Sequence, residues 1–334
     1  MTQPRVLVTG AAGKTGRAVL AALAHKGARA RALVHREDQS AGARTWGAAE
    51  TVVGDMRDRA VLKQAASGVD AIYHIAPNMS PDEVEIGETL ISAAKAAGVW
   101  RVVYHSVLRP QIQAMPHHWA KLLVEEALFR SGLNVTVLQP GPYAQNLLAE
   151  LDTVRATGQL RVPYSIEVEF AMVDLWDVAA VAARCLTEPV RAPEADLFRD
   201  DARVGLAALD DHGADDDHSF AVYELAGPRN VSVRQVSGAF GTVLGSPVTA
   251  VTVPLDEWRS RAEEAGMAEP VRAGLAAMFD YYDAHGLRGN GRTLRTLLRR
   301  PGLDAYECLR REARMALSRE ERDAFVRTRA ARRR

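Results

Sequence analysis

The chain has 334 residues, 47% of them hydrophobic, and its 42 basic and 42 acidic side chains give a formal net charge of zero. This length can bury a large core, and the charge balance argues against nucleic acid as the main partner. The only cysteines are Cys185 and Cys308, and no apolar run approaches the about eighteen residues of a membrane span. We therefore expect a cytoplasmic protein with no membrane segment and no metal site.

The first predicted elements are a strand at Arg5–Thr9 and a helix over residues 17–25. A glycine-rich turn joins them, with Gly10, Gly13 and Gly16 in the spacing G-x-x-G-x-x-G. The first glycine permits a tight turn, the second lets the backbone approach a pyrophosphate, and the third lets the helix pack on the strand. Free N–H groups at a helix start favour phosphate. The turn therefore predicts a dinucleotide-binding site.

Five further strand-like runs follow at the spacing of βαβ units, over residues 29–34, 50–53, 71–75, 101–104 and 134–138. Helical periodicity lies between them, most clearly over residues 83–97 and 119–129. Strands rich in Val and Ile with little alternation are typical of a sheet covered on both faces. We predict an α/β fold with a doubly wound parallel sheet (Rossmann fold), whose ligands bind at the carboxyl ends of the strands.

The regular alternation stops after about residue 149. A strand is expected over residues 164–172, a helix over 175–186, and then an acidic surface insertion over 190–219 in which His212 and His218 match no metal-ligand spacing. Beyond it we expect a strand at 221–225, a helix at 233–244, a strand at 248–253 and mainly helices from residue 255. The predicted domains are a dinucleotide-binding unit, residues 1–155 with 168–186 returning to it, and a smaller mixed, mainly helical substrate lobe, residues 156–167 and 187–334.

Four segments together resemble the NmrA-like family of atypical short-chain dehydrogenases. They are the glycine turn, Gly54-Asp55-Met56, Tyr104-His105-Ser106 and the Tyr-Glu-Leu-Ala-Gly run at 223–227. The chain is most similar to the bacterial quinone oxidoreductase and triphenylmethane reductase branch, which also carries a segment like residues 289–301. The resemblance covers nearly the whole chain except the insertion. It implies that Ala12, Gly13, Lys14 and Thr15 line the phosphates, that Asp55 and Met56 lie by the adenine, and that Ala76 and Asn78 end a strand under the cofactor.

The end of the second strand bears on the choice of cofactor. It reads Leu-Val-His35-Arg36, with no carboxylate where an NAD-binding chain grips the ribose hydroxyls. A cation at Arg36 can neutralise a 2′-phosphate, so the sequence favours NADP. Glu37 and Asp38 follow directly, and they keep NAD as the alternative.

The candidate catalytic residues Ser106, His117 and Lys121 resemble the serine, tyrosine and lysine of typical short-chain dehydrogenases, with the tyrosine missing. His117 and Lys121 stand four residues apart, so one helix face presents both. Such a lysine would bind the nicotinamide ribose, and a histidine that titrates near neutrality can donate a proton. The alternatives are an exposed histidine at a helix start and a serine that satisfies a strand end.

Tyr143, in a turn-rich segment after the sixth strand, is a further candidate as a proton donor or stacking face, unless it packs under the second lobe.

The leading hypothesis is an NAD(P)H-dependent reductase that transfers hydride to a small or aromatic electrophile, such as a quinone, an enone or an imine, with His117 in place of the tyrosine. Two alternatives stay open: a non-catalytic NADP-binding redox sensor that regulates a partner protein, and a non-redox biosynthetic enzyme. Both a homodimer and a regulatory protein partner are compatible with the sequence.

Overall fold

The computed structural model describes residues 3–188 and 218–331. The acidic insertion expected at residues 190–219 falls almost wholly outside the described residues.

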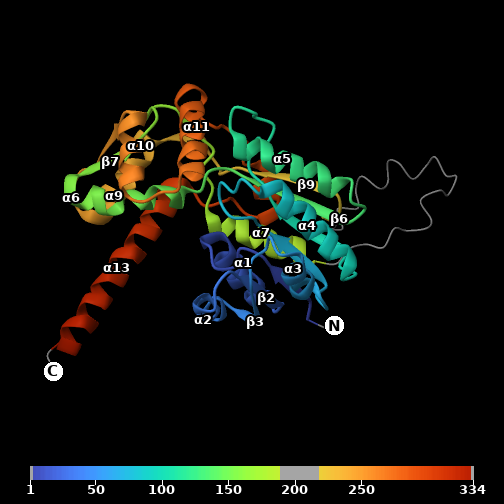
Figure 1. The fold of residues 1–334 in the computed structure, drawn as a ribbon. Coiled ribbons are helices and arrows are strands. Elements are labelled where there is room, and N and C mark those ends of the chain that lie inside the picture. Colours follow the sequence, from blue (N-terminus) through green and yellow to red (C-terminus); the bar gives the residue numbers. More distant parts are fainter. Residues whose placement is uncertain (1–2, 189–217, 332–334) are drawn as a thin grey trace, which may run out of the picture.

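A seven-stranded sheet forms the centre of the first part of the chain, in the order β3-β2-β1-β4-β5-β6-β9 (Figure 1). Every neighbouring pair in it is parallel. Its strands are β1 (Arg5–Val8), β2 (Arg29–Val34), β3 (Ala48–Val53), β4 (Ala71–His74), β5 (Arg101–His105), β6 (Asn134–Pro140) and β9 (Ala221–Leu225). The order reverses between β1 and β4, which is the position where a doubly wound sheet opens a ligand crevice. The predicted fold class is confirmed.

Helices cover both faces of this sheet (Figure 1). Val6 and Val8 pack into one core cluster with residues of α1 (Lys14–His25) and α7 (Leu175–Thr187). Leu7 points the other way, into a second cluster, because successive strand residues face opposite sides. That second face carries α3 (Arg59–Ala66), α4 (Glu83–Ala96) and α5 (Pro116–Phe129), while α2 (Asp38–Thr45) lies against β3.

All but one of the remaining elements form a lobe with a third core cluster of its own. Two small sheets belong to it, a parallel pair of β7 (Gln159–Val162) with β11 (Thr249–Thr252) and an antiparallel pair of β8 (Glu169–Phe170) with β10 (Val231–Ser232). Its helices are η1 (Ala144–Glu150), α6 (Leu151–Thr157), α9 (Val233–Leu244), α10 (Leu255–Glu264), α11 (Glu269–His285) and the long α13 (Ala305–Ala331). Helix α12 (Arg292–Leu298) instead packs on α7 and β9, with its leucines in the first core cluster. Helix α13 packs on α9 and η1 and then runs away from the lobe (Figure 1).

One predicted strand was wrong in extent. The alternating run over residues 164–172 forms only the two-residue β8, and β7 ends before Pro163, which lacks a ladder N–H. The alternation arose because Tyr164, Ile166, Val168 and Phe170 all pack into the lobe core without a continuous strand partner. Burial of one side of an irregular segment thus imitates the period of a strand.

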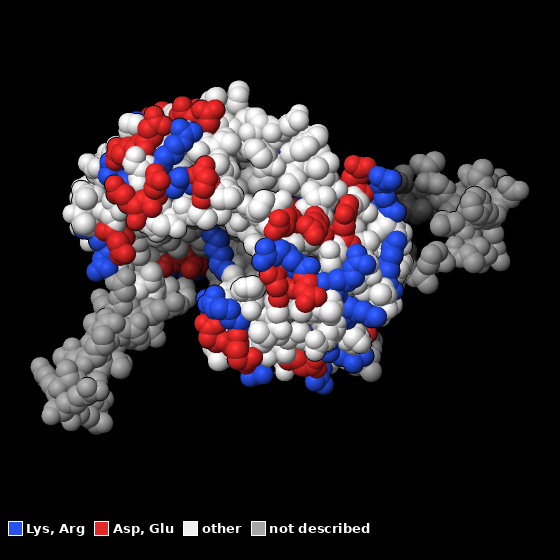
Figure 2. Space-filling view, in the orientation of Figure 1, with Lys and Arg blue, Asp and Glu red and all other residues white. Residues whose placement is uncertain are grey.

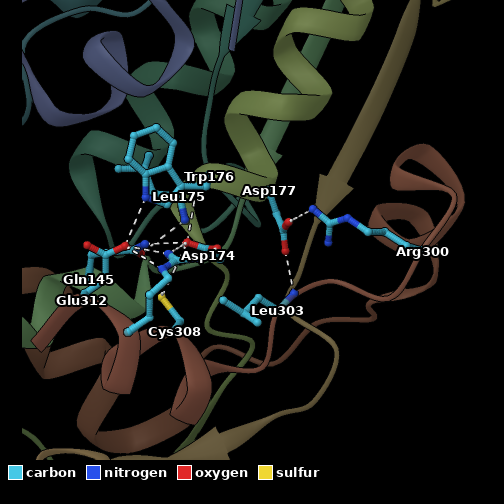
Figure 3. Close-up of polar contacts among 10 residues, drawn as sticks. Gln145, Asp174, Leu175, Trp176, Asp177, Arg300, Leu303, Cys308 and Glu312 are labelled. Atoms are coloured by element: carbon cyan, nitrogen blue, oxygen red, sulfur yellow. Dashed lines mark hydrogen bonds and ion pairs between the residues drawn. The ribbon is translucent and has the colours of Figure 1, made fainter. Parts of the chain in front are cut away.

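Two buried carboxylates attach the lobe to the N-terminus of α7 (Figure 3). Asp174 caps the helix by accepting from the Trp176 N–H, and it also accepts from the side chains of Gln145 and Arg311. Asp177 accepts hydrogen bonds from the Arg300 side chain and from the backbone N–H of Leu303, each at 2.6 Å. Each carboxylate side chain is only 2% exposed, so these bonds fix α7 against α13 and the segment that leads into it.

Candidate active site

A cavity of about 1210 Å³ extends from the glycine turn to the C-terminal lobe. Charged side chains of both signs interleave on the molecular face in Figure 2, where a hollow separates the lobe from the sheet. All but one of the residues predicted for the site line the cavity: Gly10, Ala12, Gly13, Lys14, Thr15, Gly16, His35, Asp55, Met56, Ala76, Asn78, Ser106, His117, Lys121 and Tyr143. Arg36 is the exception.

The glycine turn has the geometry that a pyrophosphate cradle needs. Gly10 has φ +57°, and a Cβ there would lie 2.8 Å from Cγ2 of Ile75. At Gly16 a Cβ would lie 2.4 Å from the carbonyl oxygen of Gly10, so the helix packs directly on the turn. Gly13 is the N-cap of α1, and a Cβ there would meet only that same carbonyl oxygen, at 3.3 Å. The first and third glycines are therefore required by the fold, while the second leaves its space open for a ligand.

Two ion pairs lie just after the carboxyl ends of β2 and β3. Arg57 donates to both oxygens of Asp55, and this hydrogen bonding lowers the pKa of Asp55 to about 2. Arg57 also lines the cavity, although the sequence did not single it out. The guanidinium of Arg36 instead lies on Asp38, with N–O distances of 3.1 and 3.2 Å, and both side chains are exposed.

Lys121 is held by a buried carboxylate that the sequence did not reveal. Its Nζ lies 2.9 Å from Oε1 of Glu83 and 3.2 Å from the carbonyl oxygen of His105. The hydroxyl of Tyr104 donates to the same Glu83 oxygen, also at 2.9 Å. These contacts fix the lysine at the carboxyl end of β5, under the cavity.

A second buried carboxylate, Glu125, holds Ser106. The serine hydroxyl donates to Oε1 of Glu125, and the Gln139 amide donates to both carboxylate oxygens at 3.0 Å. Burial raises the pKa of Glu125. Ser106 is itself wholly buried, so its hydroxyl is committed to this carboxylate rather than to solvent.

His117 lines the cavity, but it does not titrate near neutrality as the sequence led us to expect. Burial, together with the neighbouring His118 and Lys121, lowers its pKa to about 2. The rings of His117 and His118 meet edge to face at 4.4 Å between centroids. Nδ1 of His117 is buried and has no hydrogen-bond partner among the described residues. The ring is thus neutral at pH 7 and can act as a hydrogen-bond donor or acceptor, but not as an imidazolium.

The histidine before Ser106 has partners that the sequence did not show. Nδ1 of His105 lies 2.5 Å from the hydroxyl oxygen of Tyr73, and Nε2 lies 3.1 Å from that of Tyr143. Burial lowers the pKa of His105 to about 3 and raises that of Tyr143. Nζ of Lys14 lies 5.8 Å from the Tyr143 ring centroid and donates to the Asn146 side chain.

The lobe closes the other side of the cavity with aromatic rings. Tyr164 packs against Phe170, Phe279 and Tyr282, with centroids 5.2 to 5.9 Å apart. Trp258 meets Phe279 edge to face at 4.8 Å. All five side chains line the cavity, so its lobe wall is apolar and rich in flat surfaces.

The comparison with protein families agrees with this geometry, because the NmrA-like family model matches residues 2–197. The chain belongs to the NmrA-like family. This membership confirms the resemblance drawn from the sequence motifs, and it covers the glycine turn, β5 and the segment that carries Tyr143.

Two curated relatives cover most of the chain. The NAD(P)H azoreductase of Xenophilus azovorans is 28% identical over 281 residues, which are 82% of this chain and 86% of the relative. Quinone oxidoreductase 2 of Escherichia coli is 25% identical over 302 residues, 89% and 94% of the two chains. Among solved structures, the Citrobacter sp. triphenylmethane reductase complexed with NADP(H) has a TM-score of 0.73, with 20% identity over 92% of this chain and 99% of that chain. This last likeness is one of fold.

Neither a candidate membrane span nor a candidate metal site occurs in residues 3–188 and 218–331. Within these ranges no helix combines the length and the apolar character that crossing a membrane requires. The same ranges hold no group of three or more His, Cys, Asp or Glu side chains placed to share a metal ion.

Proposed function

We propose that the chain is an NAD(P)H-dependent reductase that transfers hydride to a small or aromatic electrophile, such as a quinone, an enone or an imine. One observation carries the proposal: a single cavity joins the glycine turn to an apolar aromatic wall. Hydride transfer needs little more than a nicotinamide held against its acceptor with water excluded. The names of the two curated relatives, an azoreductase and a quinone oxidoreductase, support this class of reaction.

NADP is the proposed cofactor, with NAD as the alternative. The residues fit it, because the open face of Gly13 at the N-terminus of α1 leaves room for a pyrophosphate. Arg36 would leave its ion pair with Asp38 to bind the 2′-phosphate, because an ion pair between two solvent-exposed side chains is only weakly stabilising. Asp55 and Met56 would lie by the adenine, and Lys121 would bind the nicotinamide ribose.

The polar end of the cavity would hold the heteroatom of the acceptor. The cofactor supplies the hydride, so the side chains need only bind and orient the acceptor and donate hydrogen bonds to it. In this proposal His117 takes the place of the missing tyrosine as a neutral donor, because its pKa of about 2 excludes an imidazolium at pH 7. Ser106 is turned to Glu125, so we assign it to holding the helix that carries Lys121.

The test is to titrate the purified protein with NADPH and NADH and then follow nicotinamide absorbance with a panel of quinones, enones and cyclic imines. Steady oxidation with at least one acceptor supports a reductase and identifies its cofactor. Tight binding without oxidation by any acceptor would instead support the redox sensor or the non-redox enzyme. Absence of binding would overturn the assignment of the glycine turn.

A further inference from the structure

His105 is the one side chain among the described residues that contacts two tyrosine hydroxyls through its two ring nitrogens. Tyr73 comes from β4 and is wholly buried beneath the sheet end. Tyr143 precedes η1 and lines the cavity. The histidine directly precedes Ser106 at the end of β5, so the chain of three groups runs from the core to the cavity.

The buried end of this chain fixes the tautomer of the histidine. A neutral imidazole carries one N–H donor and one acceptor nitrogen. If Nδ1 carried the hydrogen, it would donate to Tyr73, whose own hydroxyl hydrogen would then have no acceptor among the described residues. A buried hydroxyl hydrogen without an acceptor is strongly disfavoured. Tyr73 therefore donates to Nδ1, and the hydrogen of the ring lies on Nε2.

The tautomer in turn orients Tyr143. With the hydrogen on Nε2, His105 donates to the Tyr143 oxygen across 3.1 Å. Because the Tyr143 oxygen accepts this bond, its hydroxyl hydrogen is not used by His105 and can point into the cavity that Tyr143 lines.

We propose that His105, held by Tyr73, is a positioning residue that directs the hydroxyl hydrogen of Tyr143 toward the carbonyl oxygen or imine nitrogen of the substrate. This inference rests on the proposed function. Tyr143 is then a hydrogen-bond donor to the acceptor, and it retains its proton because burial raises its pKa. Tyr73 does not contact the substrate. It excludes the tautomer in which Tyr143 would donate its hydrogen to Nε2 of His105 and could no longer donate it to the substrate.

The test compares Tyr73→Phe, Tyr143→Phe and the double variant. Tyr223→Phe is the matched control, because its hydroxyl contacts a histidine, His218, at 3.0 Å but does not line the cavity. We expect kcat to fall about tenfold in Tyr143→Phe, the value of one hydrogen bond, and severalfold in Tyr73→Phe. The double variant should be no slower than Tyr143→Phe, because both changes remove the same donor. The control should retain the kcat of the unmodified protein.

Some kinetic results would overturn the inference. Additive losses in the double variant, or an unchanged kcat in a folded Tyr73→Phe variant, would contradict it. So would a loss of NADPH affinity in Tyr143→Phe with no change in kcat, since the tyrosine would then serve the cofactor.

A second readout does not depend on turnover. ¹⁵N chemical shifts of labelled histidine, with His105 assigned through His105→Gln, report which ring nitrogen carries the hydrogen. We expect Nε2–H in the unmodified protein and a mixture of tautomers in Tyr73→Phe. Nδ1–H in the unmodified protein would overturn the inference even if the protein is an active reductase. If the expected tautomers are found and no acceptor is reduced, the orientation stands and the proposed function fails.

Discussion

The ammonium of Lys121 lies 2.9 Å from the Glu83 carboxylate, and the two side chains are only 10% and 5% exposed. Removing one partner of such a pair leaves an uncompensated buried charge, whereas removing both does not. We expect Glu83→Gln and Lys121→Met each to lower the free energy of unfolding by about 3 kcal/mol. The double variant should lose much less than the sum. Denaturant unfolding of all four proteins checks this, and additive losses would mean that the two charges do not depend on each other.

Gly13 offers a change that spares the fold but not the ligand. An added Cβ would meet only the carbonyl oxygen of Gly10, at 3.3 Å, so Gly13→Asp should fold. Its carboxylate would stand at the N-terminus of α1, where the pyrophosphate is proposed to bind, and would repel it. We expect NADPH binding to be lost in a titration. Gly42→Asp, at a helical position with no atom within 4 Å of the added Cβ, should bind as the unmodified protein does, and unchanged binding by Gly13→Asp would refute the proposed cofactor site.

Two arginines allow a test of cofactor preference. Arg36 pairs with one exposed carboxylate, while Arg57 is shared by Asp55 and Asp82. We expect Arg36→Gln to weaken NADPH binding about tenfold and to leave NADH binding unchanged, because a charge-assisted hydrogen bond to the 2′-phosphate is lost. Arg57→Gln should change the affinity for both cofactors equally, because it acts on Asp55, which is proposed to lie by the adenine that both share. The ratio of the two dissociation constants is the measurement, and an unchanged ratio in Arg36→Gln would favour NAD as the natural cofactor.

The sheet could be predicted from the sequence because its determinants are local. Runs such as Ala71–His74 are buried on both faces, and glycines such as Gly132 end helices just before strands. The run at 164–172 misled because its alternation reflects contact with the lobe core and not a ladder. The period of the apolar residues alone cannot distinguish a strand in a sheet from an irregular segment with one buried side.

Some features of the site could likewise be predicted from neighbouring residues, whereas others depend on residues far apart in the sequence. The glycine turn lies within seven consecutive residues, so its spacing is visible in the sequence. Glu83 stands 38 residues before Lys121, and Tyr73 stands 32 residues before His105, so only the fold brings each pair together. Glu125 had a signal, because it follows Lys121 by four residues on the same helix. The lowered pKa of His117 could not be predicted, since it depends on burial by several elements.

His117 is proposed to act as a neutral hydrogen-bond donor, and this role can be separated from proton donation by an imidazolium. A glutamine side chain also donates hydrogen bonds, whereas phenylalanine does not. We expect His117→Phe to lower kcat about tenfold and His117→Gln to retain most of it. Because the pKa of His117 is about 2, kcat of the unmodified protein should show no inflection from this group between pH 6 and 8. An inflection near pH 6.5 that disappears in His117→Gln would show that the histidine works as an acid.

The buried histidines should make the fold sensitive to acid, and His74 allows the effect to be measured. It is wholly buried, and burial lowers its pKa from 6.5 to about 3. As the pH falls below about 6.5 the unfolded chain binds a proton at this site that the folded chain does not, so the free energy of unfolding must decrease. Each such group contributes a slope of about 1.4 kcal/mol per pH unit within this window.

Denaturant unfolding at pH 7, 6 and 5 should therefore show that the free energy of unfolding depends less steeply on pH in His74→Gln than in the unmodified protein. His25→Gln, which replaces an exposed histidine, should keep the original slope. Equal slopes in all three proteins would mean that His74 is protonated as readily in the folded chain as in the unfolded one.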